Sequence, residues 1–172
     1  LTPDALPQAI KAAAIILGEA PTHETDAALE LIVGAHARYS VSLEDEHVLG
    51  EQLDAIRSNV DEDVSLVFIL AHDVEMDPAD VRSLIAHFET VDRLGLLIPD
   101  RVSGVMGNDI AEVSISAIVD SPCVVLRASA LAEVGGFDVG FASIAVLANL
   151  ARALRRRDWK IQAAEEVVVE DP

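Results

Sequence analysis

Three polar residues follow the most apolar segment of the chain. Residues 64–71, VSLVFILA, form a continuous apolar run, and His72, Asp73 and Glu75 come directly after it. Carboxylate oxygens are the ligands that Mg²⁺ and Mn²⁺ prefer, so Asp73 and Glu75 could hold a divalent cation, with His72 as a further ligand or a base. The competing interpretation is a pair of solvated loop carboxylates and a surface histidine.

A second group of candidates surrounds a pair of glycines. Gly135 and Gly136 are followed by Phe137 and Asp138. A carboxylate can orient a substrate hydroxyl or accept its proton, which makes Asp138 a candidate catalytic residue. The alternative interpretation of Asp138 is an acid that forms a turn after the glycine pair.

Other residues with reactive or charged side chains are better explained by structure. Asp77 and Pro78 suit the N-cap and first position of a helix, so Asp77 is predicted to be a cap and not a ligand. Cys123 lies in an apolar segment and is predicted to be a small core residue. Arg155, Arg156 and Arg157 are interpreted as a helix-end charge cluster. The motifs G-x-S-x-G, G-x-x-x-x-G-K-[ST] and G-x-G-x-x-G do not occur, which excludes a hydrolase elbow and the usual nucleotide-binding loops.

Predicted helices and strands alternate along the chain. The predicted helices cover residues 5–17, 47–58, 78–90 and 143–157, with a short helix capped by Ser129 and ended by Gly135 and Gly136. The predicted strands cover residues 28–34, 39–43, 64–71, 94–98 (stopped by Pro99), 112–118, 122–127, 159–163 and 166–169, with a loop over 100–110. This order predicts an α/β/α sandwich with a mostly parallel sheet, in which residues 64–71 form a central strand.

Composition and charge narrow the class of protein. The 172 residues suit a single domain, and with 51% hydrophobic residues they can form a packed core. The 30 acidic and 12 basic residues give a net charge of −18, which would repel nucleic acids and anionic membranes. No apolar run approaches about 18 residues and no signal peptide is recognisable, so no transmembrane segment is expected in this chain.

Three segments carry a resemblance to a known family. Residues 66–84 are similar to the strand, acidic loop and helix of family 2 glycosyltransferases, which have the GT-A fold of nucleotide-diphospho-sugar transferases. Residues 121–138 resemble the family's R-S-A-L-x-x-x-G-G-F-D segment, and Arg155, Arg156 and Trp159 fit the R-R-x-x-W that follows. The similarity covers residues 60–172, and the first 60 residues fit only in the order of elements. The GT-A order predicts that strand 122–127 lies beside strand 64–71 and antiparallel to it.

The resemblance implies a site for a nucleotide-diphospho-sugar, with Mg²⁺ or Mn²⁺ as the cofactor. Its metal motif has two acids separated by one residue, and these positions fall on Ala71 and Asp73. Glu75 restores an acid pair in a shifted register. His72, Gly135 and Gly136 become substrate-binding candidates, and Asp138 the weak candidate for the catalytic residue.

Other family positions lack their acids. The stretch that supplies the family's general base falls on residues 146–149, Val-Leu-Ala-Asn. The Asp-rich turn that reads the nucleotide base would follow strand 29–33, where Gly34, Ala35 and His36 stand. Because the chain is expected to open with a helix, the family's first strand is expected to be absent.

These substitutions predict a GT-A-like domain with weak or absent sugar transfer and a scaffold or interaction role, as part of a larger protein with partner domains. The resemblance implies a bacterial, cytoplasmic protein, at the cytoplasmic face of the membrane where regions outside this chain anchor it. The first alternative is an active glycosyltransferase that moves a sugar to a cell-envelope acceptor, with a metal held by Asp73. The second is an unrelated α/β regulatory binding domain.

Overall fold

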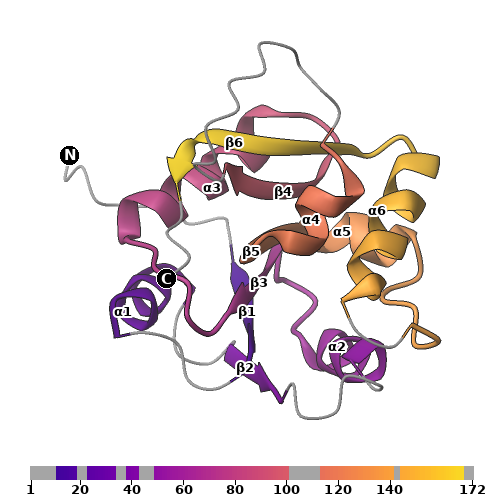
Figure 1. Ribbon diagram of the computed structural model, residues 1–172, viewed down its shortest axis with the longest axis horizontal. Coiled ribbons are helices and arrows are strands. Elements are labelled where there is room, and N and C mark those ends of the chain that lie inside the picture. The colour runs from indigo at the N-terminus through magenta and orange to yellow at the C-terminus, as the bar shows by residue number, and fades with distance from the viewer. Residues whose placement is uncertain are drawn as a thin grey trace.

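One mixed sheet lies between two layers of helices (Figure 1). The computed structural model describes residues 11–18, 23–33, 38–42, 49–100, 113–141 and 144–168. In chain order the elements are β1 (Ala12–Leu17), α1 (His23–Val33), β2 (Arg38–Val41), α2 (Leu49–Asn59), β3 (Leu66–Ala71), α3 (Pro78–Thr90), β4 (Leu94–Asp100), α4 (Ile115–Asp120), β5 (Cys123–Arg127), α5 (Ala128–Glu133), α6 (Ala145–Arg156) and β6 (Lys160–Val168).

The strand order across the sheet is β2-β1-β3-β5-β4-β6. β1 pairs in parallel with β2 and β3, and β4 pairs in parallel with β6. β5 runs antiparallel to both of its neighbours, β3 and β4. The prediction that residues 122–127 lie antiparallel beside residues 64–71 is therefore confirmed. This placement favours the GT-A arrangement over the regulatory-domain alternative.

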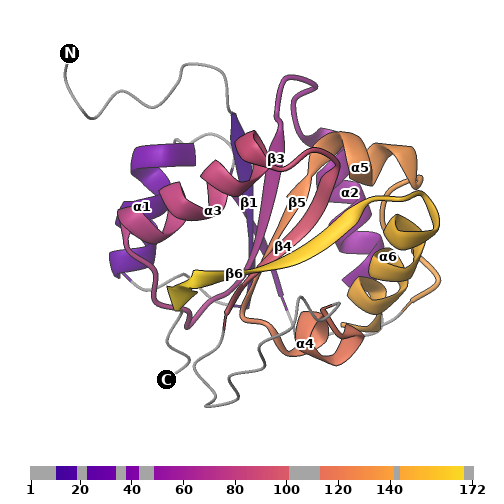
Figure 2. The ribbon, with the colours of Figure 1, turned by 90° about the horizontal axis from the view of Figure 1, so that it is seen from above.

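Each face of the sheet has its own apolar core. Figure 2 shows α1 and α3 on one side of the sheet and α2, α5 and α6 on the other. Along β3, Phe68 and Leu70 pack with the α1 and α3 side, whereas Val67 and Ile69 pack with the α2 and α6 side. A strand that is buried on both faces is apolar at every position, which explains the run that the sequence shows here.

Trp159 of the R-R-x-x-W segment is a structural anchor directly before β6, which is the outer strand of the sheet on the side away from β2. Its indole Nε1 donates to Glu133 Oε2 at 3.2 Å. The Arg93 guanidinium lies 4.2 Å from the centroid of the indole ring and also donates to the carbonyl of Arg157 at 2.6 Å. Gly95 leaves room for the indole, since an added Cβ would lie 3.0 Å from Trp159 Cβ. The cluster fixes the turn between α6 and β6 against the start of β4.

The first third of the chain corrects two predictions. Residues 5–17 were expected to be a helix, but Ala12–Leu17 form β1, and residues 5–10 lie outside the described residues. Alanine favours helices intrinsically, but burial between β2 and β3 outweighs that preference. The strand expected at 28–34 is wrong as well, because residues up to Val33 belong to α1. The first strand of the sheet is thus present, which corrects the prediction that it is absent.

Later differences concern the ends of elements. The strand expected at 112–118 is wrong, because Ser114 caps α4 and residues 115–120 are helical. Ser129 is not a cap, since α5 begins directly after Arg127. β4 continues through Pro99 to Asp100, and the register of its pairing with β6 shifts there. The two closing strands are one continuous strand, β6. The loop expected at 100–110 falls, from residue 101, outside the described residues.

Cys123 gives a direct test of the packing of β5. Its side chain is fully buried opposite Leu70 of β3, and this burial raises the pKa of the thiol well above its ordinary value. Because the thiolate is the reactive form, we expect no modification by Ellman's reagent at pH 8 in the native protein and complete modification in urea. Rapid reaction of the native protein would contradict the burial of β5.

Candidate functional site

The carboxyl ends of β1, β2 and β3 are aligned at one edge of the sheet. Leu17 lies opposite both Val41 of β2 and Ala71 of β3. Just beyond these positions the Gly18 amide donates to the Val41 carbonyl at 2.8 Å, and the His72 amide donates to the Leu17 carbonyl at 3.1 Å. In open α/β sheets this edge is where ligands bind, and it is the edge from which His72, Asp73 and Glu75 extend.

His72 packs on the end of β1. Gly18 has a φ of +106°, and a Cβ added to it would lie 2.6 Å from His72 Nδ1. A side chain at position 18 would therefore displace the imidazole in addition to straining the backbone. The histidine is half-buried, and this contact gives it a packing role at the candidate site.

The loop between β3 and α3 alternates between buried and outward-facing side chains. Val74 is fully buried and Met76 is 2% exposed, whereas Asp73 is half-buried and Glu75 is exposed. The two apolar residues anchor the loop in the core beside α1 and α3. Their burial leaves Asp73 and Glu75, which are two positions apart, on the solvent side of the loop.

Thr25 of α1 holds this loop by two hydrogen bonds. Its hydroxyl donates to the Val74 carbonyl at 2.6 Å and accepts from the Met76 amide at 3.1 Å. Thr25 is fully buried. Sequence reasoning missed this residue, because nothing in a helix sequence indicates a partner loop 49 positions away.

The donor set at this edge fits one mode of metal binding. Among the described residues, no group of three or more His, Cys, Asp or Glu side chains could hold a metal ion by itself. Mg²⁺ is commonly bound by one or two carboxylates together with phosphate oxygens and water. Asp73 and Glu75 suit that shared mode, in which the remaining ligands would come from a diphosphate and from solvent.

Asp77 is a helix cap, as predicted. Its Oδ1 accepts from the amides of Ala79 at 2.7 Å and Asp80 at 2.9 Å. The Asp77 amide in turn donates to Asp80 Oδ2 at 3.1 Å, which completes a capping box at the start of α3. Asp77 therefore fixes where α3 begins, directly after the loop that carries Asp73 and Glu75.

The glycine pair ends α5 and contacts α2. The Gly136 amide donates to the Leu131 carbonyl and the Gly135 amide to the Ala132 carbonyl, which is the Schellman pattern. Both glycines have positive φ, +89° and +86° for Gly135 and Gly136. A Cβ on Gly136 would lie 2.5 Å from Asp54 Oδ1, whereas a Cβ on Gly135 would meet nothing within 4 Å. Their confirmed role is structural, and substrate binding by them stays a prediction.

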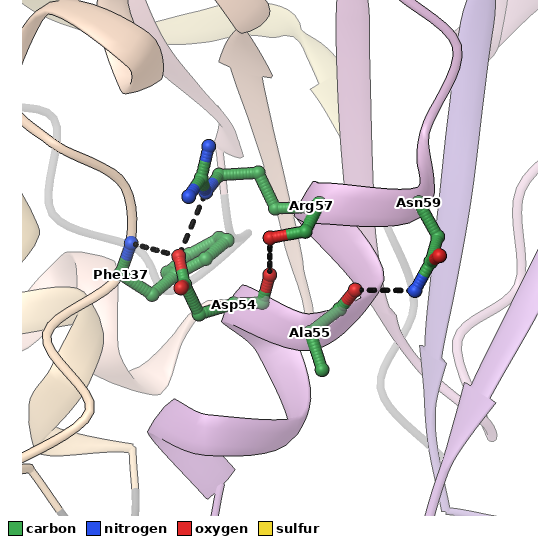
Figure 3. Close-up of polar contacts among 6 residues, drawn as sticks. Asp54, Ala55, Arg57, Asn59 and Phe137 are labelled. Atoms are coloured by element: carbon green, nitrogen blue, oxygen red, sulfur yellow. Dashed lines mark hydrogen bonds and ion pairs between the residues drawn. The ribbon is translucent and has the colours of Figure 1, made fainter.

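Asp54 of α2 holds the segment that follows the glycines. Figure 3 shows its carboxylate between the Arg57 guanidinium and the backbone of Phe137. Asp54 Oδ1 accepts from Arg57 Nε at 2.7 Å and from the Phe137 amide at 3.2 Å. The Asp54 carboxylate thus ties the G-G-F-D segment to α2. The i, i+3 spacing of Asp54 and Arg57 indicates an ion pair, but sequence alone does not reveal the third partner.

Asp138 lies in a tight turn that packs on the start of α2. Its Oδ1 accepts from the Gly140 amide at 2.9 Å, and its Oδ2 accepts from Asn149 Nδ2 of α6 at 3.3 Å. A Cβ on Gly50 of α2 would lie 2.5 Å from the Asp138 carbonyl oxygen, so the turn and the helix are in close contact. These contacts support the turn-forming interpretation, although the carboxylate remains exposed.

Three of the four positions matched to the general-base stretch are part of the core. Val146, Leu147 and Ala148 are at most 8% exposed and pack in the cluster on the α2 and α6 side. Asn149 is half-buried and bonds to Asp138. The base-reading turn was expected to follow a strand at residues 29–33, but these residues are helical. Residues 34–36, where the turn would lie, are outside the described residues.

A cleft of about 570 Å³ lies at the amino end of β3, on the side of the sheet away from the loop that carries Asp73 and Glu75. None of the candidate residues lines it. Its walls come from the end of α2, the turn before β3 and the start of α5, and include Arg57, Asp61, Ser65 and Arg127. The Arg127 guanidinium is already engaged, since it donates to the carbonyls of Leu94 and Phe88 at 2.8 Å each. The sequence gives no indication of this cleft.

Comparison with solved structures identifies the fold. A glucosyl-3-phosphoglycerate synthase from Mycobacterium tuberculosis, in complex with Mg²⁺ and UDP, aligns over 95% of this chain and 72% of its own, with 12% identity and a TM-score of 0.60. A mannosyltransferase from Pyrobaculum calidifontis, in complex with GDP-Man and Mn²⁺, aligns over 92% of this chain and 47% of its own, with 14% identity and a TM-score of 0.61. TarS of S. aureus aligns over 93% and 36%, with 11% identity and a TM-score of 0.56.

Sequence comparisons add no assignment. No family model matches the chain, and no curated protein matches it. No described helix is long and apolar enough to cross a membrane. The similarity to the solved structures, together with the antiparallel β5, shows that this chain has a GT-A glycosyltransferase-like fold.

The two glycines after α5 form a matched pair for a stability test. Replacing either with Ala should cost about 1–2 kcal/mol, because both have left-handed backbone angles. Gly136→Ala should cost about 1–2 kcal/mol more, since its Cβ would displace Asp54 from the Phe137 amide. Urea denaturation of both variants measures this difference. Equal losses would show that Gly136 does not contact Asp54.

Asp77 permits a test that separates capping from metal binding. Asp77→Ala should lower the free energy of unfolding by about 1 kcal/mol, whereas Asp77→Asn should be close to neutral because asparagine caps equally well. Urea denaturation measures both. A neutral Asp77→Ala variant would contradict the capping role, and a loss of Mn²⁺ affinity in a stable Asp77→Asn variant would assign the residue to the metal.

Proposed function

We propose that this chain is a GT-A-like domain with a residual nucleotide-diphospho-sugar site, weak or absent sugar transfer, and a scaffold or interaction role in a larger protein. The donor would lie at the carboxyl edge of β1, β2 and β3. Asp73 and Glu75 would share a Mg²⁺ or Mn²⁺ ion with its diphosphate. Structurally similar enzymes in complex with UDP or GDP-Man and these metals support this class of ligand.

The proposal depends mainly on the start of α6. The stretch that supplies the family's general base falls on Val146, Leu147, Ala148 and Asn149, none of which is an acid; the first three are buried in the apolar core, and Asn149 is half-buried. An ionised carboxylate at the three buried positions would carry a large desolvation cost, so the core there does not accommodate one. Loss of a general base commonly lowers the rate about 10² to 10⁴-fold.

Weaker metal binding is expected to lower the transfer rate further. A divalent cation neutralises the charge that develops on the leaving diphosphate, which is worth several kcal/mol in the transition state. Asp73 is half-buried and Glu75 is exposed. The acid pair is shifted from the positions that the family uses, and its two carboxylates differ in burial. We therefore expect this pair to bind the metal ion more weakly than the acid pair of the family does. Weak metal binding and a missing base together support a domain that retains the fold with little transfer.

The second candidate is an active glycosyltransferase in which Asp73 and Glu75 hold the metal. It is favoured by one observation, the presence of β1, which completes the ligand-binding edge of the sheet. The base would then be Asp138, whose carboxylate is exposed in the turn beside α2, or a group outside this chain. In this second candidate function, the enzyme would transfer the sugar to a cell-envelope acceptor.

Calorimetric titration with UDP-, GDP- and dTDP-sugars in the presence of Mn²⁺ tests the proposal. We expect the nucleotide-sugars to bind with millimolar affinity or not detectably. In a separate assay of nucleoside diphosphate release, we expect no more release than in buffer alone. Asp73→Ala is the site variant, and Asp92→Ala is the matched control, because Asp92 is an exposed carboxylate next to the amino end of β4.

Micromolar binding that Asp73→Ala abolishes and Asp92→Ala leaves intact would overturn the proposal in favour of the active enzyme. An ordered Mn²⁺ ion bound by Asp73, with a pyrophosphate beside it in crystals soaked with donor, would lead to the same conclusion.

A further inference from the structure

We infer that Thr25 is the positioning residue of the candidate donor site, and that its hydroxyl sets the direction of Asp73 and Glu75. This inference rests on the proposed function, because it concerns the same loop. It adds a residue of α1 that does not belong to any of the motifs found in the sequence.

The Thr25 hydroxyl is bonded to the loop backbone on both sides of Glu75. The Val74 carbonyl and the Met76 amide both meet the Thr25 hydroxyl, at 2.6 and 3.1 Å. One hydroxyl therefore acts as donor and acceptor to two residues that flank Glu75 and follow Asp73. Serine and threonine are the small side chains whose hydroxyl can donate one hydrogen bond and accept another.

The contact between Thr25 and the loop is closed to solvent. Thr25 and Val74 are fully buried and Met76 is 2% exposed. Water cannot easily replace the hydroxyl at such a position, and a buried backbone group that loses its partner is left with an uncompensated desolvation cost. The loop would have to move to satisfy these groups if the hydroxyl were absent, and a movement of Val74 and Met76 would redirect the residues between and before them.

The direction of the loop affects metal affinity. Two carboxylates bind a cation well only if their oxygens point to one position, and groups that orient metal ligands commonly contribute about 10–100-fold to affinity. Asp73 and Glu75 both lie in the loop after β3, where Glu75 forms an isolated β-bridge. Thr25 and the two buried apolar side chains, together with this bridge, fix the direction of the loop backbone.

The test uses Mn²⁺ alone as the probe, with selective broadening of backbone amide resonances in the intact chain, a method that detects millimolar affinity. We expect Mn²⁺ to broaden the amides of residues 72–75 in the unchanged protein. Thr25→Val, which keeps the shape and removes the hydroxyl, should weaken this Mn²⁺ affinity about 10-fold or more. Thr25→Ser should keep it, because the serine hydroxyl can form both bonds.

Two controls separate positioning from general stability. Thr90→Val removes an exposed threonine hydroxyl that bonds to Ala86 at the end of α3, and it should leave Mn²⁺ affinity unchanged. Hydrogen exchange of the Met76 amide should become faster in Thr25→Val and stay slow in Thr25→Ser. If Thr25→Val does not fold, the comparison of Thr25→Ser with the unchanged protein and with Thr25→Ala decides the question by the same readouts.

The outcomes distinguish the two proposals. If the unchanged protein shows no broadening at residues 72–75, both the metal part of the proposed function and this inference are wrong. If the unchanged protein shows broadening and a folded Thr25→Val variant shows the same, only the positioning role of Thr25 is wrong. Broadening that is lost in Thr25→Val and kept in Thr25→Ser supports both.

Discussion

The parallel pairing of β1 with β3 is the constraint on which the candidate site depends. Leu17 and Ala71 lie opposite one another, so the residues that follow them, Gly18 and His72, must emerge side by side. Because both strands are buried on both faces, a slip in register would misplace a whole row of core side chains. Gly18 makes the edge compact enough for His72 to lie across it. The loop with Asp73 and Glu75 then starts from a fixed point.

Much of this arrangement could be predicted where the sequence pattern is long or has distinct ends. The eight-residue apolar run around β3 and the Asp77–Pro78 start of α3 each have a pattern that few other structures share. β1 and α1 were missed for opposite reasons. The Ala-Ala-Ala stretch of β1 has high helix propensity, and the short apolar run in α1 does not distinguish a strand from a helix. In both cases burial decided the structure, and burial is not visible in so few residues.

The site was predictable only in part, for a similar reason. Asp73, Glu75 and the cap of Asp77 are local features, so their spacing indicates them. The contacts of Thr25 with the loop and of Asp54 with Phe137 join segments that are far apart in the chain. The G-G-F-D segment illustrates the difference. Its match to the family is visible in the sequence, but its contacts with α2 are not: the structure shows that Asp54 of α2 bonds to the Phe137 amide and lies against Gly136.

Cys123 has a consequence for how this protein can be studied. It is the single cysteine of the chain, and it is enclosed between β3 and β4. A thiol introduced at an exposed position, such as Glu75→Cys in the loop or Val139→Cys in the turn beside α2, would therefore be the only accessible one. Fluorescent or spin labels could be attached there without first removing the native cysteine, so the core would keep its original packing during the measurement.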